Sequence, residues 1–223
     1  VTFMPKPTTG DWRSGAHINF SLQKVDNPGV NIFETAEGGD FSEECMHAVG
    51  GLMAHSEALT AIVCPTVNSY NGLVPRVGGF EGGTVTWAPT NITYGHNNRS
   101  AQFRLPQSRF CIENRAADMC MNVYLGFAMT LAAVEGITNK MDPGPATDID
   151  LYNTPEEEIK ARGIRRLPRN LMVATEALRN DDLAGDVMGQ TMRNSFLAYK
   201  VDEWERYHQA VTDWEVEEYL RLY

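Results

Sequence analysis

The chain has 223 residues, a mass of 24.8 kDa, a formal net charge of -10 and a sequence pI near 5.0. With 43% hydrophobic and 22% charged residues it has an ordinary globular composition, and its length suits one well-formed core. The acidity excludes a non-specific nucleic-acid binder, which needs clustered positive charge, and the longest apolar-rich run, residues 125–137, is too short to cross a bilayer.

Four scattered cysteines, Cys45, Cys64, Cys111 and Cys120, form neither a C-x-x-C pair nor a dense disulfide framework. The sequence therefore predicts free thiols in a reducing cytosol. The first residue is Val1 rather than Met, and no signal peptide follows, so we expect a processed chain or a fragment.

The first elements in chain order are two short strands separated by a loop. Residues 1–7 predict a strand that stops at prolines, and residues 10–15 predict a turn-rich loop. From Ala16 to Leu22 polar and apolar residues alternate, which places His17, Asn19 and Ser21 on one face of a second strand. A single histidine on a strand is more often a hydrogen-bonded structural residue than a metal ligand, so both roles stay open for His17.

Helices are predicted next. Residues 27–39 are loop-like, and Ser42 can begin a helix whose apolar residues recur at helical spacing. A second apolar helix closes at Pro65. Glycines on either side of Phe80 and Glu81 suit a mobile lid and equally suit a passive loop. Residues 84–87 and 92–94 then read as short strands.

An island of positive charge follows. No Asp or Glu lies between Glu81 and Glu113, although Arg99, Arg104 and Arg109 all fall in that interval. Alternation in residues 100–105, a turn at 106–108 and renewed alternation predict a β-hairpin. Its cationic face would carry Arg104 from the first strand and the residues Arg109, Cys111, Glu113 and Arg115 from the second.

Several guanidiniums beside one carboxylate suit a polyanion, because each presents a planar fork of donors to phosphate or carboxylate oxygens. Glu113 could then hold a metal ion that bridges phosphates. The alternative is a solvated edge strand whose arginines pair with acidic residues from elsewhere in the chain.

The rest of the chain is predicted to be mainly helical. Residues 121–140 predict one strongly apolar helix packed behind the sheet, and the last third is charged, with Pro155 at one helix start and Pro168 before the next. Aromatic residues between Thr191 and Tyr223 form stripes that predict either packing or oligomer contacts.

Several of these segments resemble the motifs of the glutamine synthetase family. Similar to its signatures, in the family's order, are F-M-P-K-P at residues 3–7, H-x-N-x-S at 17–21, P-T-x-N-S-Y at 65–70, N-R-S-A-x-x-R at 98–104, E-x-R at 113–115 and N-x-Y-L at 122–125. The resemblance implies an α+β fold of the glutamine synthetase catalytic-domain type, with an antiparallel active-site sheet, outer helices and a C-terminal helical segment. Residues 1–223 would be a partial catalytic domain that lacks the N-terminal β-grasp domain and early metal-binding strands, and would be inactive alone.

By the same resemblance, the activity is ATP-dependent formation of glutamine from glutamate and ammonia through γ-glutamyl phosphate, in a cytoplasmic homo-oligomer, a ring dodecamer. The implied cofactors are ATP and Mg²⁺ or Mn²⁺. His17 and Glu113 would ligate the metal, Asn19 and Ser21 would line the nucleotide site, and Arg99 and Arg104 would neutralise the transferring phosphate. Arg115 would hold the substrate, and Glu81 would be the base on the flap. Arg109 would bind the nucleotide only if its strand carries a bulge.

Two of the departures from the family pattern concern glutamate binding. Trp12-Arg13-Ser14-Gly15 replaces an N-G-x-G that helps to seat glutamate, and Gly72 stands where the family has a glutamate-binding arginine, with Arg76 as a possible substitute. Three hypotheses follow: a ligase for ammonia, a sister ligase that joins glutamate to an alkyl or aromatic amine, and a non-catalytic relative. Tyr152 matches a tyrosine that some relatives adenylylate, and we interpret it here as structural.

Overall fold

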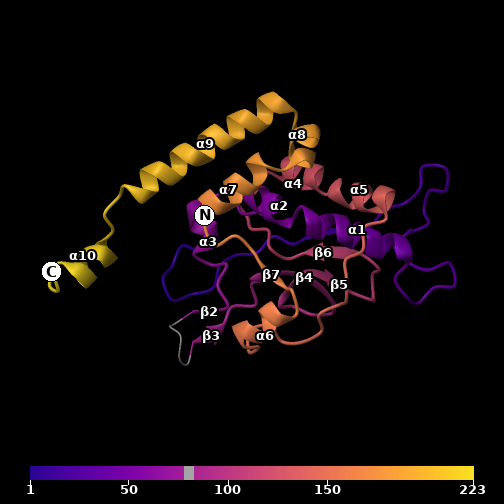
Figure 1. Cartoon of the computed structure of the whole chain (residues 1–223), viewed down its shortest axis with the longest axis horizontal. Helices are drawn as coiled ribbons and strands as arrows, with labels where there is room; N and C mark the ends of the chain where they lie inside the picture. The colour runs from indigo at the N-terminus through magenta and orange to yellow at the C-terminus, as the bar shows by residue number, and fades with distance from the viewer. Residues whose placement is uncertain (78–82) are drawn as a thin grey trace.

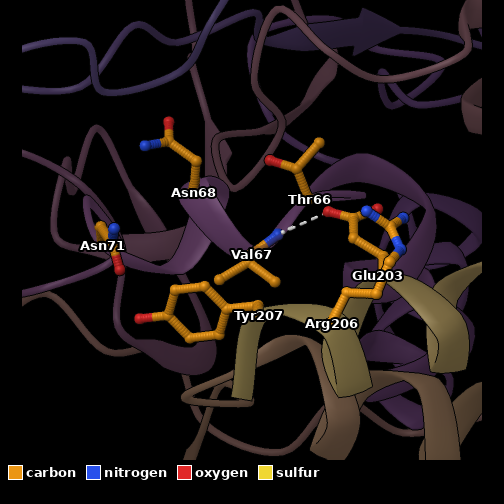
Figure 2. Close-up of a pocket in the computed structure, with 7 residues that line it drawn as sticks. All are labelled: Thr66, Val67, Asn68, Asn71, Glu203, Arg206 and Tyr207. Atoms are coloured by element: carbon orange, nitrogen blue, oxygen red, sulfur yellow. Dashed lines mark hydrogen bonds between the residues drawn. The ribbon is translucent and has the colours of Figure 1, made fainter. Parts of the chain in front are cut away.

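A five-stranded sheet, in the order β1-β6-β5-β4-β7, forms the centre of the molecule in the computed structural model, which describes residues 1–77 and 83–223 (Figure 1). Its strands are β1 (Ile18–Phe20), β4 (Asn91–His96), β5 (Ala101–Leu105), β6 (Ile112–Asn114) and β7 (Arg165–Arg166). A separate two-stranded ribbon pairs β2 (Arg76–Val77) with β3 (Thr84–Val85). The α+β class is confirmed. The sheet is mixed rather than antiparallel, because β4 and β5 pair in parallel.

The strand register separates a polar face from an apolar face. Glu113 on β6 lies opposite Asn19 on β1 and Arg104 on β5, so these three side chains form one row across the sheet. Their strand neighbours point to the other face and are buried: Ile18, Phe103 and Ile112 are between 0% and 3% exposed. The predicted hairpin is therefore confirmed, and Glu113 and Arg104 lie on one of its faces.

Helices cover the apolar face and form the core with it (Figure 1). The principal ones are α1 (Glu43–Ala54), α2 (Ser56–Val63), α5 (Ala132–Asn139) and α7 (Leu171–Arg179). Ser42 caps α1 by accepting a hydrogen bond from Cys45 N–H at 3.1 Å, as predicted. The second helix ends at Val63, just before the predicted stop at Pro65.

Smaller helices complete the chain. They are α3 (Val67–Tyr70), α4 (Val123–Met129), α6 (Glu156–Ala161), α8 (Asp182–Met188), α9 (Gln190–His208) and α10 (Asp213–Tyr219). Helix α9 leads away from the body, and α10 lies at its far end beside the C-terminus (Figure 1). None of the helices in the described residues is long and apolar enough to span a membrane.

Besides the antiparallel sheet, three further sequence predictions are wrong. Residues 1–7 form no strand. The helix predicted over 121–140 is divided at Thr130 and Leu131 into α4 and α5, and Tyr124, Phe127 and Leu131 are 84%, 54% and 49% exposed instead of lying in the core. Arg109 lies in the turn before β6 rather than on the strand, because the turn extends through Phe110, whose φ is +43°.

Candidate anion and metal site

Glu113 is the centre of the polar sheet face. The carboxylate is 6% exposed and contacts His17 Nδ1 at 2.8 Å, Arg104 at 2.8 Å and Arg115 at 3.5 Å. Arg104 lies on β5 and Glu113 on β6, whereas Arg115 immediately follows β6 and His17 immediately precedes β1. The structure thus brings together four of the residues that the sequence singled out.

The electrostatics of this cluster keep Glu113 ionised. Burial raises the pKa of the carboxyl group, but the hydrogen bonds from His17 and Arg104 and the charge of Arg115 outweigh burial and lower the pKa to about 2. A carboxylate held in this way is a fixed negative charge beside two guanidiniums. The side chain of Arg104 is 19% exposed, and its guanidinium also donates to Asn97 Oδ1 at 3.3 Å.

Asn19 and Ser21 lie on the open side of the same face. Both are exposed, and the Asn19 amide contacts the His17 backbone carbonyl at 3.3 Å. The thiol of Cys111 also faces Asn19, at 3.9 Å from its Oδ1. The predicted grouping of His17, Asn19 and Glu113 on one face is therefore observed, while Ser21 follows the end of β1.

The guanidinium of Arg115 contacts three groups of the protein. Besides Glu113, its guanidinium donates to the backbone carbonyls of Arg99 at 3.1 Å and Trp87 at 3.2 Å. Tyr152 joins the same region through its hydroxyl, which lies 3.0 Å from the Ala88 carbonyl and 3.2 Å from that of Arg99. The 9% exposure of Tyr152 agrees with the structural interpretation of this residue.

The other predicted arginines lie outside the cluster. Arg99 and Arg109 are exposed, and Arg109 has no strand bulge to bring it beside Glu113. Arg76 donates to the Gly83 carbonyl at 2.9 Å and to Asn153. Glu81, the predicted flap base, lies outside the described residues.

A divalent cation would find two suitable ligands here. His17 and Glu113 are in contact; a carboxylate suits Mg²⁺ or Mn²⁺, and an imidazole is the commonest metal ligand among side chains. Within residues 1–77 and 83–223 no group of three or more His, Cys, Asp or Glu side chains converges to hold a metal. The two residues fit one part of a metal site, whose other ligands must come from elsewhere.

Sequence reasoning missed a buried ion pair behind this face. Arg13 and Asp118 have side chains that are 4% and 0% exposed and approach to 3.4 Å. It also missed Gln102, which is fully buried with both amide atoms lacking a partner among the described residues. A lone arginine in a loop gives no periodic signal, and only the departure from the family motif at residues 12–15 pointed to Arg13.

An α+β domain whose sheet gathers two arginines and a histidine around one carboxylate is the class that this fold and site define. The family model for the glutamine synthetase catalytic domain matches residues 1–219. The chain belongs to the glutamine synthetase catalytic-domain family, as its motifs predicted.

Individual relatives cover the whole chain. It is 36% identical to a glutamine synthetase of Methanococcus maripaludis, covering 100% of this chain and 48% of that protein. It is 38% identical to a glutamate–methylamine ligase of Methyloversatilis universalis, covering 100% of this chain and 49% of that protein. A solved GmaS–ADP complex superposes with a TM-score of 0.85 and 34% identity, over 99% of this chain and 49% of that one. The chain thus spans about half the length of the curated relatives it matches.

Proposed function

We propose that the full-length protein is an ATP-dependent ligase that joins the γ-carboxylate of glutamate to ammonia or another amine. The observation that carries the proposal is the contact of His17, Arg104 and Arg115 with the single carboxylate of Glu113 on one sheet face. Membership of the glutamine synthetase family gives this cluster its chemical context.

The proposed reaction has two steps. An oxygen of the substrate γ-carboxylate attacks the γ-phosphorus of ATP, and ADP leaves, which gives γ-glutamyl phosphate. The amine nitrogen then attacks the carbonyl carbon, phosphate leaves, and a base takes the proton from nitrogen. Phosphorylation is needed because a free carboxylate has no good leaving group, and the protein mainly positions the reactants and stabilises charge.

Within this chain the residues divide that work. Arg99 and Arg104 would neutralise the transferring phosphate, and Arg115 would hold the loops of Trp87 and Arg99 while facing substrate. Asn19 and Ser21 would line the nucleotide, with Arg109 at its edge, and Glu81 would take the proton from the amine. His17 and Glu113 would hold Mg²⁺ or Mn²⁺, which supplies charge neutralisation at the phosphates.

The test is turnover by the full-length protein with ATP, Mg²⁺, glutamate and ammonia, measured as phosphate release together with amide product. Glu113→Gln is expected to lower kcat/KM by about 100-fold or more, because it removes the ionised centre of the cluster. Glu57→Gln is the control, because its exposed side chain lies on α2 away from the sheet face. Absence of ligation with every amine would support the third hypothesis, a non-catalytic relative.

A second candidate differs in the amine. The similarity to a glutamate–methylamine ligase, together with Gly72 and the altered loop at residues 12–15, favours an alkylamine over ammonia. A screen of ammonia, methylamine and larger amines under equal conditions separates the two. Ammonia as the best acceptor, judged by kcat/KM, would refute this candidate. We also propose that the full-length protein is cytoplasmic and assembles as a homo-oligomer, a ring dodecamer.

A further inference from the structure

Arg13 is a buried cation in an otherwise exposed loop. Its side chain is 4% exposed, whereas the adjacent Trp12 is 50% exposed. The guanidinium donates to the Ala116 carbonyl, lies 3.4 Å from Asp118 Oδ2 and lies 3.8 Å from Cys64 Sγ. Because burying a charge is costly unless it is paired, these contacts hold the side chain in one position.

Gly72 leaves the room that Arg13 occupies. A Cβ at residue 72 would lie 2.3 Å from Arg13 Cβ and 2.5 Å from Arg13 Cδ, distances that no real side chain tolerates. Any other residue at position 72 would displace the arginine stem. Two of the places where this chain departs from its family pattern, Arg13 and Gly72, are therefore one packing unit.

This unit fixes the segments that carry the metal-binding pair. Arg13 lies just before His17 in the chain, and Asp118 lies just after Glu113 and Arg115. Between these anchors Ala16 N–H donates to the Ala117 carbonyl at 3.0 Å, and Ile18 pairs with Asn114.

Asp118 is itself held to the body of the protein. Its Oδ1 accepts from Cys120 N–H at 2.9 Å, and its own N–H donates to the Val63 carbonyl at the end of α2 at 3.0 Å. The loop of residues 10–15 is thus anchored, through Arg13, to a rigid helix end.

We propose that Arg13, seated on Asp118 in the space left by Gly72, is a positioning residue that holds His17 against Glu113. This inference rests on the proposed function, because it takes His17 and Glu113 as metal ligands. Arg13 does not reach the polar face itself. It acts by setting where the strand that carries His17 begins.

The test is Mn²⁺ binding to the full-length protein, measured by electron paramagnetic resonance, with ligation measured in parallel. Arg13→Met keeps the side-chain stem but removes the charge, and is expected to raise the Mn²⁺ Kd by about tenfold or more, the usual effect of losing an outer support of a metal ligand. Arg13→Lys retains the charge facing Asp118 and is expected to give a smaller rise. Saturating Mn²⁺ should restore kcat in Arg13→Met.

Lys200→Met is the matched control. Lys200 is another buried cation paired with a carboxylate, Glu203 at 2.8 Å, but it lies on α9 and contacts none of the site residues. It should change the Mn²⁺ Kd by less than about twofold while lowering thermal stability. Equal Mn²⁺ affinity in Arg13→Met, Lys200→Met and the wild type would overturn the positioning role.

Three further variants, Gly72→Ala, Arg13→Gly and their combination, test the steric link and serve if Arg13→Met fails to fold. Gly72→Ala should weaken Mn²⁺ binding as Arg13→Met does, and Arg13→Gly/Gly72→Ala should bind no more weakly than Arg13→Gly alone, because the collision is gone. Strictly additive effects would refute the coupling. If the wild type binds Mn²⁺ and ligates while Arg13 variants are unaffected, only this inference fails; a wild type that does neither also refutes the proposed function.

Discussion

Tyr152 shows how one hydroxyl connects segments around the site. It lies within hydrogen-bonding distance of the Ala88 and Arg99 carbonyls, its ring packs against Trp87, and burial raises its pKa. Tyr152→Phe should lower the free energy of unfolding by about 1 kcal/mol, because it removes the hydroxyl that donates to the buried Ala88 carbonyl. Urea denaturation measures the loss.

Tyr124→Phe is the control for that substitution, because Tyr124 is 84% exposed and its hydroxyl meets water in either state. Its expected effect is close to zero. Equal stability of both variants would mean that the Tyr152 hydroxyl makes no net contribution.

Single residues were predictable where alternation placed them and unpredictable where contacts were non-local. The alternation of residues 100–105 and 109–115 correctly predicted that Arg104 and Glu113 share a sheet face. It wrongly carried Arg109 onto that face, because a turn through a positive φ at Phe110 has no signal in polarity. The pairing of Arg13 with Asp118 joins segments far apart in the chain, and no local pattern encodes it.

Helices α1 and α5 cross closely because both carry glycine at the contact. A Cβ on Gly136 would lie 2.2 Å from the His47 carbonyl oxygen, and one on Gly51 would lie 2.0 Å from that of Ala132. Gly136→Ala should therefore destabilise the protein by about 1–3 kcal/mol or more through overpacking against rigid backbone, measurable as a lower denaturation midpoint.

Gly185→Ala is the matched control for this crossing. The nearest atom to its added Cβ is Arg193 NH1 at 2.9 Å, the far end of a flexible side chain that can move aside. Since alanine is also the better helix former, this variant should be neutral or slightly more stable. A large loss in Gly185→Ala, or none in Gly136→Ala, would contradict the packing argument.

His55 links four helices through two carboxylates. It lies between α1 and α2, and contacts Asp181, the N-cap of α8, at 2.7 Å and Glu135 of α5 at 2.9 Å. The Asp181 hydrogen bond raises the pKa of His55 and outweighs the opposing effect of burial, and the nearby Glu135 raises it further. The protonated imidazole thus stabilises the folded state.

Because the pKa of His55 is raised in the folded state, the stability that this residue contributes decreases as the pH rises. The contribution of His55 is fully present below its unfolded pKa of about 6.5 and is lost as the pH rises through the raised folded pKa. The free energy of unfolding should fall across that window in the wild type, and His55→Gln should remove this part of the slope. An unchanged slope in denaturation at a series of pH values would disprove the assignment.

The type of an element, helix or strand, was easier to predict than the residues at which it begins and ends. The apolar periodicity of residues 121–140 correctly indicated helix, but neither Pro nor Gly marks the break at Thr130 and Leu131. Periodicity also does not show which apolar face of a helix packs on the core. It therefore predicts Tyr124 and Phe127 as core residues, although both are exposed.

Across the whole molecule, the core and the exposed apolar surface are segregated. The sheet and its covering helices hold the buried residues, whereas α10 has none. Figure 1 shows α10 apart from the body that the sheet and these helices form. The exposed apolar residues at this end are Val211, Trp214, Val216, Tyr219, Leu220, Leu222 and Tyr223. Large exposed apolar groups gathered in one segment are typical of interaction sites. Of the predicted aromatic stripe, Phe196 and Trp204 pack against the core of this chain, whereas the aromatic residues of α10 are left exposed, and for them the oligomer contact stays a prediction.

Replacing both aromatic anchors tests that interpretation. Trp214 and Tyr219 are 61% and 47% exposed and pack edge-to-face on each other with ring centroids 5.7 Å apart. Trp214→Ser/Tyr219→Ser should raise the dissociation constant between full-length subunits by about tenfold or more, because aromatic anchors dominate interface energies. Sedimentation equilibrium over a dilution series gives this constant directly. Glu217→Ser, on the same helix and also exposed, should leave it unchanged, since rim charges contribute little to affinity. Identical association of all three proteins would place the subunit contact elsewhere.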